Sequence, residues 1–202
     1  MKIAILGATG RTGRSIVELS LAAGHDVTAL CRKPDALAPH PRLKVVIGDV
    51  HAPERFREAV LESEVVISAL GPSGPDFSVC SIAAERAVEN QVRRYVSISG
   101  AGVDAPGDKK GLMARVISRM IGLVSPKVMA DKVRELAVLS ASTLDWTLVR
   151  PPRLVDGPPQ KPVRVTLDQA AGTTVGRGDL ARFCLEQATD RSYTRRAPFV
   201  AW

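Results

Sequence analysis

The first residues that could do chemistry form a glycine-rich segment close to the start of the chain. Residues 7–13 read GATGRTG and directly follow the apolar run Lys2–Leu6. Three glycines at this spacing, between a buried strand and a helix, predict a loop that binds the pyrophosphate of a dinucleotide. Gly7 would permit the tight turn, Gly10 would let the backbone approach the phosphates, and Gly13 would let the helix pack closely on the sheet.

Other groups of the same segment would add to this binding. The free backbone amides at the start of a helix and the helix dipole both attract phosphate. The side chains of Thr9, Arg11 and Thr12 can donate further hydrogen bonds. The alternative is that the glycines serve only a tight turn. The strand and the helix predicted on either side favour the phosphate-binding interpretation.

The end of the second predicted strand bears on the choice between the two nicotinamide cofactors. NAD-binding folds usually place Asp or Glu there, to hold the ribose 2′-hydroxyl. In this chain Arg32 and Lys33 follow Cys31. An acidic side chain would repel a 2′-phosphate, whereas adjacent Arg and Lys would pair with it. The sequence therefore predicts NADP as the cofactor. The alternative is that both side chains are solvated charges at a strand end.

Two further strand ends are predicted to reach the same site. Asp49 and Val50 follow the third predicted strand and would lie beside the adenine. Ala69, Leu70 and Gly71 end the fourth and would approach the adenosine ribose. These residues complete the predicted cofactor site, because the carboxyl ends of parallel strands meet at one edge of a sheet.

Short apolar runs alternate along the chain with longer segments of helical period. We expect strands at residues 2–6, 26–31, 43–48, 64–70, 94–99, 146–150 and 163–167, and a last one near Phe199. Helices are expected at residues 11–23, 53–61, 79–91, 128–141 and 180–188. Gly24 would end the first helix, and Asp179 would cap the last. This order predicts one α/β domain of the Rossmann type over residues 1–202, a doubly wound, mostly parallel sheet with helices on both faces.

One segment interrupts the alternation. Residues 101–127 read as an insertion on the substrate side, after the fifth strand. Within it, residues 111–124 have the apolar spacing of an amphipathic helix. This helix would either pack on the surface or form a lid over the substrate.

Charge and composition limit the choice of partner. The net charge is +7, but the basic residues are scattered, so we expect no nucleic-acid partner and attribute the charge to an anionic cofactor or substrate. The apolar runs are too short to cross a bilayer, and the opening Lys2–Leu6 reads as a strand rather than a signal peptide. The three cysteines, Cys31, Cys80 and Cys184, are odd in number and widely spaced. This pattern favours a cytoplasmic protein without disulfides or a metal site.

Several of these motifs together resemble the atypical short-chain dehydrogenase/reductase superfamily. The likeness is strongest to its NAD(P)-binding group that includes biliverdin reductase B, a flavin reductase, and the nitrogen-metabolite repression regulators. It extends over nearly the whole chain. The resemblance implies binding of NADPH and reduction of flavins, quinones or other small carbonyl compounds. It is carried by residues 7–13, Arg32, Gly48-Asp49-Val50, Ser97-Ile98-Ser99, residues 145–151 (DWTLVRP) and Gly178-Asp179-Leu180-Ala181.

The catalytic pattern of that superfamily departs from this sequence. Typical members use a Tyr and a Lys four residues apart, but neither Tyr95 nor Tyr193 has a Lys four residues further on. The Pro-Pro-His stretch of biliverdin reductase B corresponds here to residues 151–153, which read PPR, so its histidine is missing. Its serine after the fifth strand corresponds to Gly100, with Ser99 one position earlier.

The candidate catalytic residues that remain are Ser99 and Lys132, with Arg150 and Arg153 at the same rim. Ser99 could donate a hydrogen bond to a carbonyl oxygen, and Lys132 could polarise that carbonyl or hold the nicotinamide ribose. The alternatives are a strand-end hydroxyl bonded to backbone for Ser99 and a solvated helix lysine for Lys132.

Two functions are compatible with these residues. The first is an NADPH-dependent oxidoreductase that reduces a small, flat acceptor such as a flavin or quinone, because hydride transfer is the chemistry of the cofactor. The second is a redox sensor that binds NADP(H) without catalysis and acts through a protein partner. The weak catalytic pattern motivates this alternative. A sugar-nucleotide epimerase or dehydratase is disfavoured, because it would need the Tyr and Lys pair.

Overall fold

The computed structural model describes residues 1–72, 76–109 and 125–202. In these ranges one six-stranded parallel sheet has the order β3-β2-β1-β4-β5-β6. The order reverses between β1 and β4, which opens a crevice at the carboxyl ends of the strands. The predicted Rossmann-type sheet is therefore confirmed. Its strands are β1 (Lys2–Leu6), β2 (Asp26–Cys31), β3 (Leu43–Ile47), β4 (Val65–Ser68), β5 (Arg94–Ile98) and β6 (Asp145–Val149).

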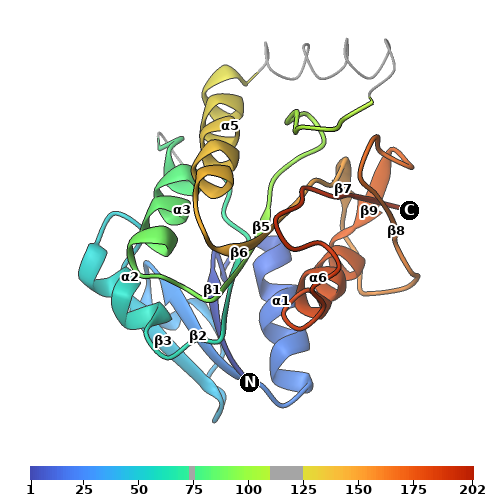
Figure 1. Cartoon of the computed structure of the whole chain (residues 1–202). Helices are drawn as coiled ribbons and strands as arrows, with labels where there is room; N and C mark the ends of the chain where they lie inside the picture. Colours follow the sequence, from blue (N-terminus) through green and yellow to red (C-terminus); the bar gives the residue numbers. More distant parts are fainter. Residues whose placement is uncertain (73–75, 110–124) are drawn as a thin grey trace.

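Helices cover both faces of this sheet (Figure 1). On one face, α1 (Arg11–Ala22) packs against α6 (Arg177–Glu186). On the other lie α2 (Pro53–Val60), α3 (Val79–Glu89) and α5 (Pro126–Ala141). Successive side chains of a strand point to opposite faces of the sheet. The two apolar cores follow from this alternation: in β1, Ile3 and Ile5 pack with α1 and α6, whereas Ala4 and Leu6 pack with the other three helices.

Short elements complete the described part of the chain. The predicted strand regions near residues 165 and 200 are confirmed as β8 (Arg164–Thr166) and β10 (Phe199–Ala201), which pair with each other outside the main sheet. The 3-10 turn η1 (Pro34–Ala36) and the paired strands β7 (Arg153–Val155) and β9 (Thr174–Gly176) are not predicted. The extra helix predicted for residues 111–124 lies outside the described residues.

The chain that leads into β10 covers the edge of β6. The amide of Leu148 donates to the carbonyl of Arg196 over 3.1 Å, and the amide of Arg150 donates to the carbonyl of Pro198 over 2.8 Å. This backbone pairing protects an edge strand that would otherwise expose unpaired donors and acceptors. In the parts of the chain that the structure describes, no helix has the length and apolar character needed to cross a membrane.

The predicted cap of the last helix is wrong. Helix α6 begins at Arg177 with Gly176 as its N-cap, and Asp179 lies inside its first turn. The buried carboxylate of Asp179 accepts hydrogen bonds from the backbone amides of Gln160 at 2.8 Å and Lys161 at 3.0 Å, and from the indole of Trp202 at 3.0 Å. These partners lie outside the helix, so Asp179 fastens neighbouring segments to α6. The cap predicted for the first helix agrees with the structure: Gly24 has a φ of +77°.

Candidate nucleotide-binding site

A cleft of about 840 Å³ opens at the carboxyl ends of the strands. It runs from the glycine-rich loop past the ends of β2, β3, β4 and β5 to the start of β7. Two predicted cofactor residues, Gly13 and Lys33, lie outside its lining. The predicted site residues that line it are Gly7, Thr9, Gly10, Arg11, Thr12, Arg32, Asp49, Val50, Ala69, Leu70, Gly71, Ser99 and Lys132.

The glycine-rich loop depends on two positions that carry no side chain. Gly7 has a φ of +74°, and a Cβ there would lie 2.8 Å from the backbone carbonyl of Ala69. A Cβ on Gly13 would lie 2.0 Å from the carbonyl oxygen of Gly7. The amide of Gly10 donates to that same oxygen over 3.0 Å and closes the turn. Helix α1 therefore begins directly against the loop, with its unpaired first amides beside the cleft.

An arginine that the sequence analysis did not single out braces this loop. The Nε of Arg14 donates to the carbonyl of Thr9 over 3.1 Å, and its Nη2 donates to the carbonyl of Ala36 over 2.9 Å. Arg14 thus ties the loop to the η1 turn after β2. Just before this turn, Arg32 is exposed at the cleft, whereas Lys33 is the N-cap of η1 and is exposed outside it.

Ser99 follows β5 and presents a hydroxyl with unmet hydrogen-bonding capacity. Its amide donates to the carbonyl of Val149 over 2.7 Å. Its Oγ is buried and has no hydrogen-bond partner among the described residues. The alternative of a hydroxyl bonded to backbone is therefore not what the structure shows. A buried polar atom without a partner is unfavourable, so a rotation of this side chain toward the cleft would let a bound group satisfy it.

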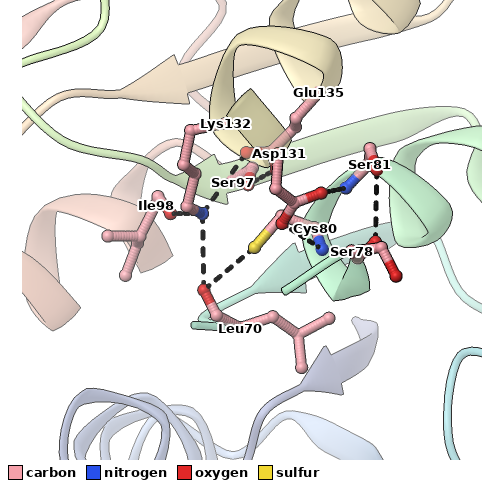
Figure 2. A network of polar contacts seen from close by, with 9 residues as sticks. All are labelled: Leu70, Ser78, Cys80, Ser81, Ser97, Ile98, Asp131, Lys132 and Glu135. Atoms are coloured by element: carbon pink, nitrogen blue, oxygen red, sulfur yellow. Dashed lines mark hydrogen bonds and ion pairs between the residues drawn. The ribbon is translucent and has the colours of Figure 1, made fainter. Parts of the chain in front are cut away.

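Lys132 lies in α5 and is buried, with only 8% of its surface exposed. Figure 2 shows its ammonium between the ends of two strands and a carboxylate. The Nζ donates to the carbonyl of Ile98 over 2.8 Å, to the carbonyl of Leu70 over 3.4 Å and to Glu135 over 3.3 Å. The alternative of a solvated helix lysine is therefore wrong. Lys132 joins the ends of β4 and β5 to α5, because all three donor positions of its ammonium are occupied.

The charges around Lys132 keep its ammonium protonated. Burial acts to lower the pKa of Lys132, but the carboxylate of Glu135 and the sulfur of Cys80 raise it, and the net shift of the pKa is upward. Glu135 is itself fully buried and also accepts a short hydrogen bond from the hydroxyl of Ser97. A charged, fully bonded ammonium suits an anchor between elements better than a proton donor to a substrate.

The neighbouring Asp131 connects the same helix to α3. Its carboxylate accepts the amide of Cys80 over 3.0 Å and the amide of Ser81 over 2.9 Å (Figure 2). It therefore caps α3 from outside that helix, where the side chain of the N-cap Ser78 makes no capping bond. Burial raises the pKa of the Cys80 thiol to about 12, so this sulfur stays protonated at neutral pH and is a poor nucleophile.

The expectation that Arg150 lies at the rim of the cleft is wrong. Its side chain is buried and forms ion pairs with Asp108 at 2.6 and 2.7 Å. Its guanidinium also stacks over the ring of Phe199, with 3.7 Å between the guanidinium carbon and the ring centre. Arg150 thus holds the loop after β5 against the segment that leads into β10. Arg153, in contrast, lines the cleft as expected.

Sequence reasoning also missed several residues of the cleft, among them Arg177. Arg177 lies at the start of α6 and lines the cleft beside the glycine-rich loop. Its Nη1 donates to the hydroxyl of Thr12 over 3.3 Å. Nothing in the local sequence signals this contact, because the two residues are 165 positions apart and meet only through the packing of α6 on α1.

The strand order, the glycine cradle and the cleft at the strand ends define a nucleotide-binding protein of the Rossmann class. Residues 7–191 match the model of the NAD(P)H-binding family, and the chain belongs to that family. The NAD(P)-binding part of the predicted resemblance is thereby confirmed.

Individual relatives match to different extents. An isoflavone reductase homolog of Solanum tuberosum is 33% identical over 113 residues, which are 51% of this chain and 37% of that protein. The chain thus spans little more than a third of the length of this curated relative. The anaerobillin reductase ChuY of Escherichia coli O157:H7 has a TM-score of 0.83 at 20% identity, over 100% of this chain and 97% of the other.

A third match contains a cofactor. A short-chain dehydrogenase/reductase of Veillonella parvula DSM 2008, solved in complex with NADP, has a TM-score of 0.78 at 21% identity. The match covers 100% of this chain and 94% of the other. At such identities the two solved structures show a shared fold.

The close approach of Gly13 to Gly7 gives a first prediction. We expect Gly13→Ala to destabilise the protein, although alanine favours a helix interior over glycine by about 1 kcal/mol. The reason is the backbone oxygen 2.0 Å from the added carbon. Gly71→Ala is the matched control, since nothing lies within 4 Å of its added carbon. Urea unfolding of both variants measures the effect. Equal midpoints would contradict the proposed contact.

The buried ammonium gives a second prediction. We expect Lys132→Met to lower the free energy of unfolding by about 3–5 kcal/mol, because the buried carboxylate of Glu135 loses its cation. Adding Glu135→Gln to this variant should recover most of the loss. Arg134 lies in the same helix as Lys132 and forms an exposed ion pair with Glu85 of α3. Arg134→Met removes this pair and should change the free energy of unfolding by less than about 1 kcal/mol. Denaturant unfolding compares the variants, and a Lys132→Met variant as stable as the native chain would refute the anchoring role.

Proposed function

We propose that the protein is an NADPH-dependent reductase of a small, flat acceptor, such as a flavin, a quinone or a related carbonyl compound. The observation that carries the proposal is the continuity of the cleft. It begins at the glycine cradle and Arg32 and extends to the unpartnered hydroxyl of Ser99. A single cleft could thus hold a dinucleotide and, beyond the nicotinamide of that dinucleotide, a second small molecule.

Each part of the cleft suits one part of NADPH. The loop from Gly7 to Gly13, with the side chains of Thr9, Arg11 and Thr12, would hold the pyrophosphate. Arg32 would pair with the 2′-phosphate, with Lys33 adding charge from outside the cleft. Residues at the ends of β3 and β4 would contact the adenosine part of the cofactor. Asp49 and Val50 would flank the adenine, and Ala69, Leu70 and Gly71 the adenosine ribose.

At the far end of the cleft, the residues suit an acceptor that needs little acid catalysis. Val128, Met129 and Pro152 supply apolar surface for a flat ring system. The hydroxyl of Ser99 can donate a hydrogen bond to a carbonyl oxygen there. The bound cofactor supplies the hydride. Lys132 contributes by holding the carbonyls of Leu70 and Ile98, which fixes the strand ends that form the wall of the cleft.

A second function is favoured by one observation. Lys132 is fully bonded within the protein, so of the two candidate catalytic residues only Ser99 has an unpartnered donor among the described residues. So few candidate catalytic donors also suit a module that binds NADP(H) without catalysis and reports the redox state of the nucleotide to a protein partner. We further propose a cytoplasmic location for either function, because Cys31, Cys80 and Cys184 are all buried free thiols.

Turnover separates the two functions. We expect the purified protein to oxidise NADPH when flavins, quinones or aldehydes are supplied one at a time, and the absorbance of NADPH at 340 nm to fall in steady state. Ser99→Ala should reduce turnover more than it reduces the affinity for NADPH. Firm binding of NADPH with no turnover of any acceptor would reject the reductase. Recovery of a protein partner only in the presence of NADP(H) would then support the sensor.

The end of β2 gives a prediction on cofactor choice. We expect Arg32→Asp with Lys33→Ser to weaken NADP binding about tenfold or more, because charge-assisted bonds to the 2′-phosphate are lost. NAD binding should change little or improve, since Asp can accept bonds from the ribose hydroxyls. Arg32→Asp alone should account for most of the effect, because Lys33 lies outside the cleft. Calorimetry with both nucleotides at one salt concentration tests this. Equal wild-type affinities for NADP and NAD that the double substitution leaves unaltered would reject the assignment of NADP.

A further inference from the structure

A carboxylate lies between two arginines at the edge of the glycine-rich loop. Asp156, in the segment between β7 and β8, accepts a hydrogen bond from the Nε of Arg177 over 2.6 Å. Its other oxygen pairs with Nη1 of Arg11 at 3.1 Å. Arg11, Thr12 and Arg177 line the cleft beside the loop. An anionic group of the protein thus already engages both arginines next to the predicted pyrophosphate site.

The three side chains differ in how firmly they are held. The side chain of Arg177 is only 14% exposed and also bonds to Thr12, whereas those of Arg11 and Asp156 are 71% and 66% exposed. Hydrogen bonding from Arg177 lowers the pKa of Asp156, so the carboxylate is charged at neutral pH. Arg177 therefore keeps its place through packing and the contact with Thr12. Asp156 is the partner that can move away into solvent.

We propose that Arg177 binds the pyrophosphate of the dinucleotide and that Asp156 competes with this pyrophosphate for Arg177 and Arg11. The inference rests on the proposed cofactor site and adds to it a residue from the last helix. A guanidinium pairs with phosphate oxygens in the same forked geometry that it uses for a carboxylate. The position of Asp156 therefore marks a place where an anion is favourable. A phosphate that enters has to displace the carboxylate or bear its repulsion.

This competition predicts opposite effects for the two partners. Arg177→Gln should weaken NADPH binding about tenfold, because one charge-assisted contact is lost. Asp156→Asn should tighten NADPH binding about threefold, an effect of the size expected for an exposed ion pair. Inorganic pyrophosphate should respond in the same two directions, since it carries the shared phosphate chemistry without the nucleosides.

Calorimetric titration at fixed, low salt measures these affinities, and melting temperatures check that each variant is folded. Glu62→Gln is the matched control for Asp156→Asn. It removes one exposed carboxylate paired with Lys2, far from the cleft, and changes the net charge equally. We expect this control to leave both affinities unchanged. Because Asp156 is exposed, its variant tests the proposal even if Arg177→Gln fails to fold.

Two results would overturn the inference. Weaker NADPH binding by Asp156→Asn would mean that the carboxylate positions Arg177 for the ligand instead of competing with it. Wild-type affinity in a folded Arg177→Gln variant would mean that this arginine does not touch the phosphates. In both cases firm NADPH binding by the native protein would leave the proposed function standing. A native protein that binds no NADPH would reject both the function and the inference.

Discussion

The close contact between two stretches of backbone determines where the candidate site lies. The carbonyl of Gly7 and the α-carbon of Gly13 meet without side chains between them, and this allows α1 to begin directly above the end of β1. Because α1 begins there, its amide ends and its dipole point at the same edge of the sheet as the ends of β2, β3 and β4. Any side chain at Gly13 would push the helix away from the loop. The cleft therefore depends on the absence of two methyl groups as much as on any side chain that lines it.

A second constraint acts at the other end of the cleft. Moving an ammonium group from water into the protein interior costs several kcal/mol, even after the protein relaxes around it. At Lys132 this cost is offset by two strand-end carbonyls and by the carboxylate of Glu135. Such a group is stable only when all its partners are in place. The ends of β4 and β5 are thus held in fixed positions relative to α5, and the wall next to Ser99 is held with them.

The sequence predicts well those features that are repeated over many residues. Helical and strand periods identify the main sheet, and the glycine spacing identifies the loop, because both are local consequences of backbone geometry. Features set by distant contacts are missed or wrong. Asp179 looks like a helix cap, but besides Arg182 of its own helix it binds residues 160, 161 and 202, which lie outside that helix. Arg150 ends a strand beside the cleft, yet it turns inward to Asp108. Arg177 enters the cleft only through the packing of two helices far apart in the chain.

The contact between Thr12 and Arg177 also bears on how the chain folds. The two residues are separated by 165 positions, so the chain between them has to close a very long loop before the helices α1 and α6 can dock. Loop closure of this length opposes folding entropically, and contacts of high sequence separation form slowly. We therefore expect the phosphate side of the cleft to assemble after the first strands have paired. An anion bound by both the loop and α6 would stabilise the docked position of this helix. It would thereby oppose local unfolding in which α6 separates from the sheet.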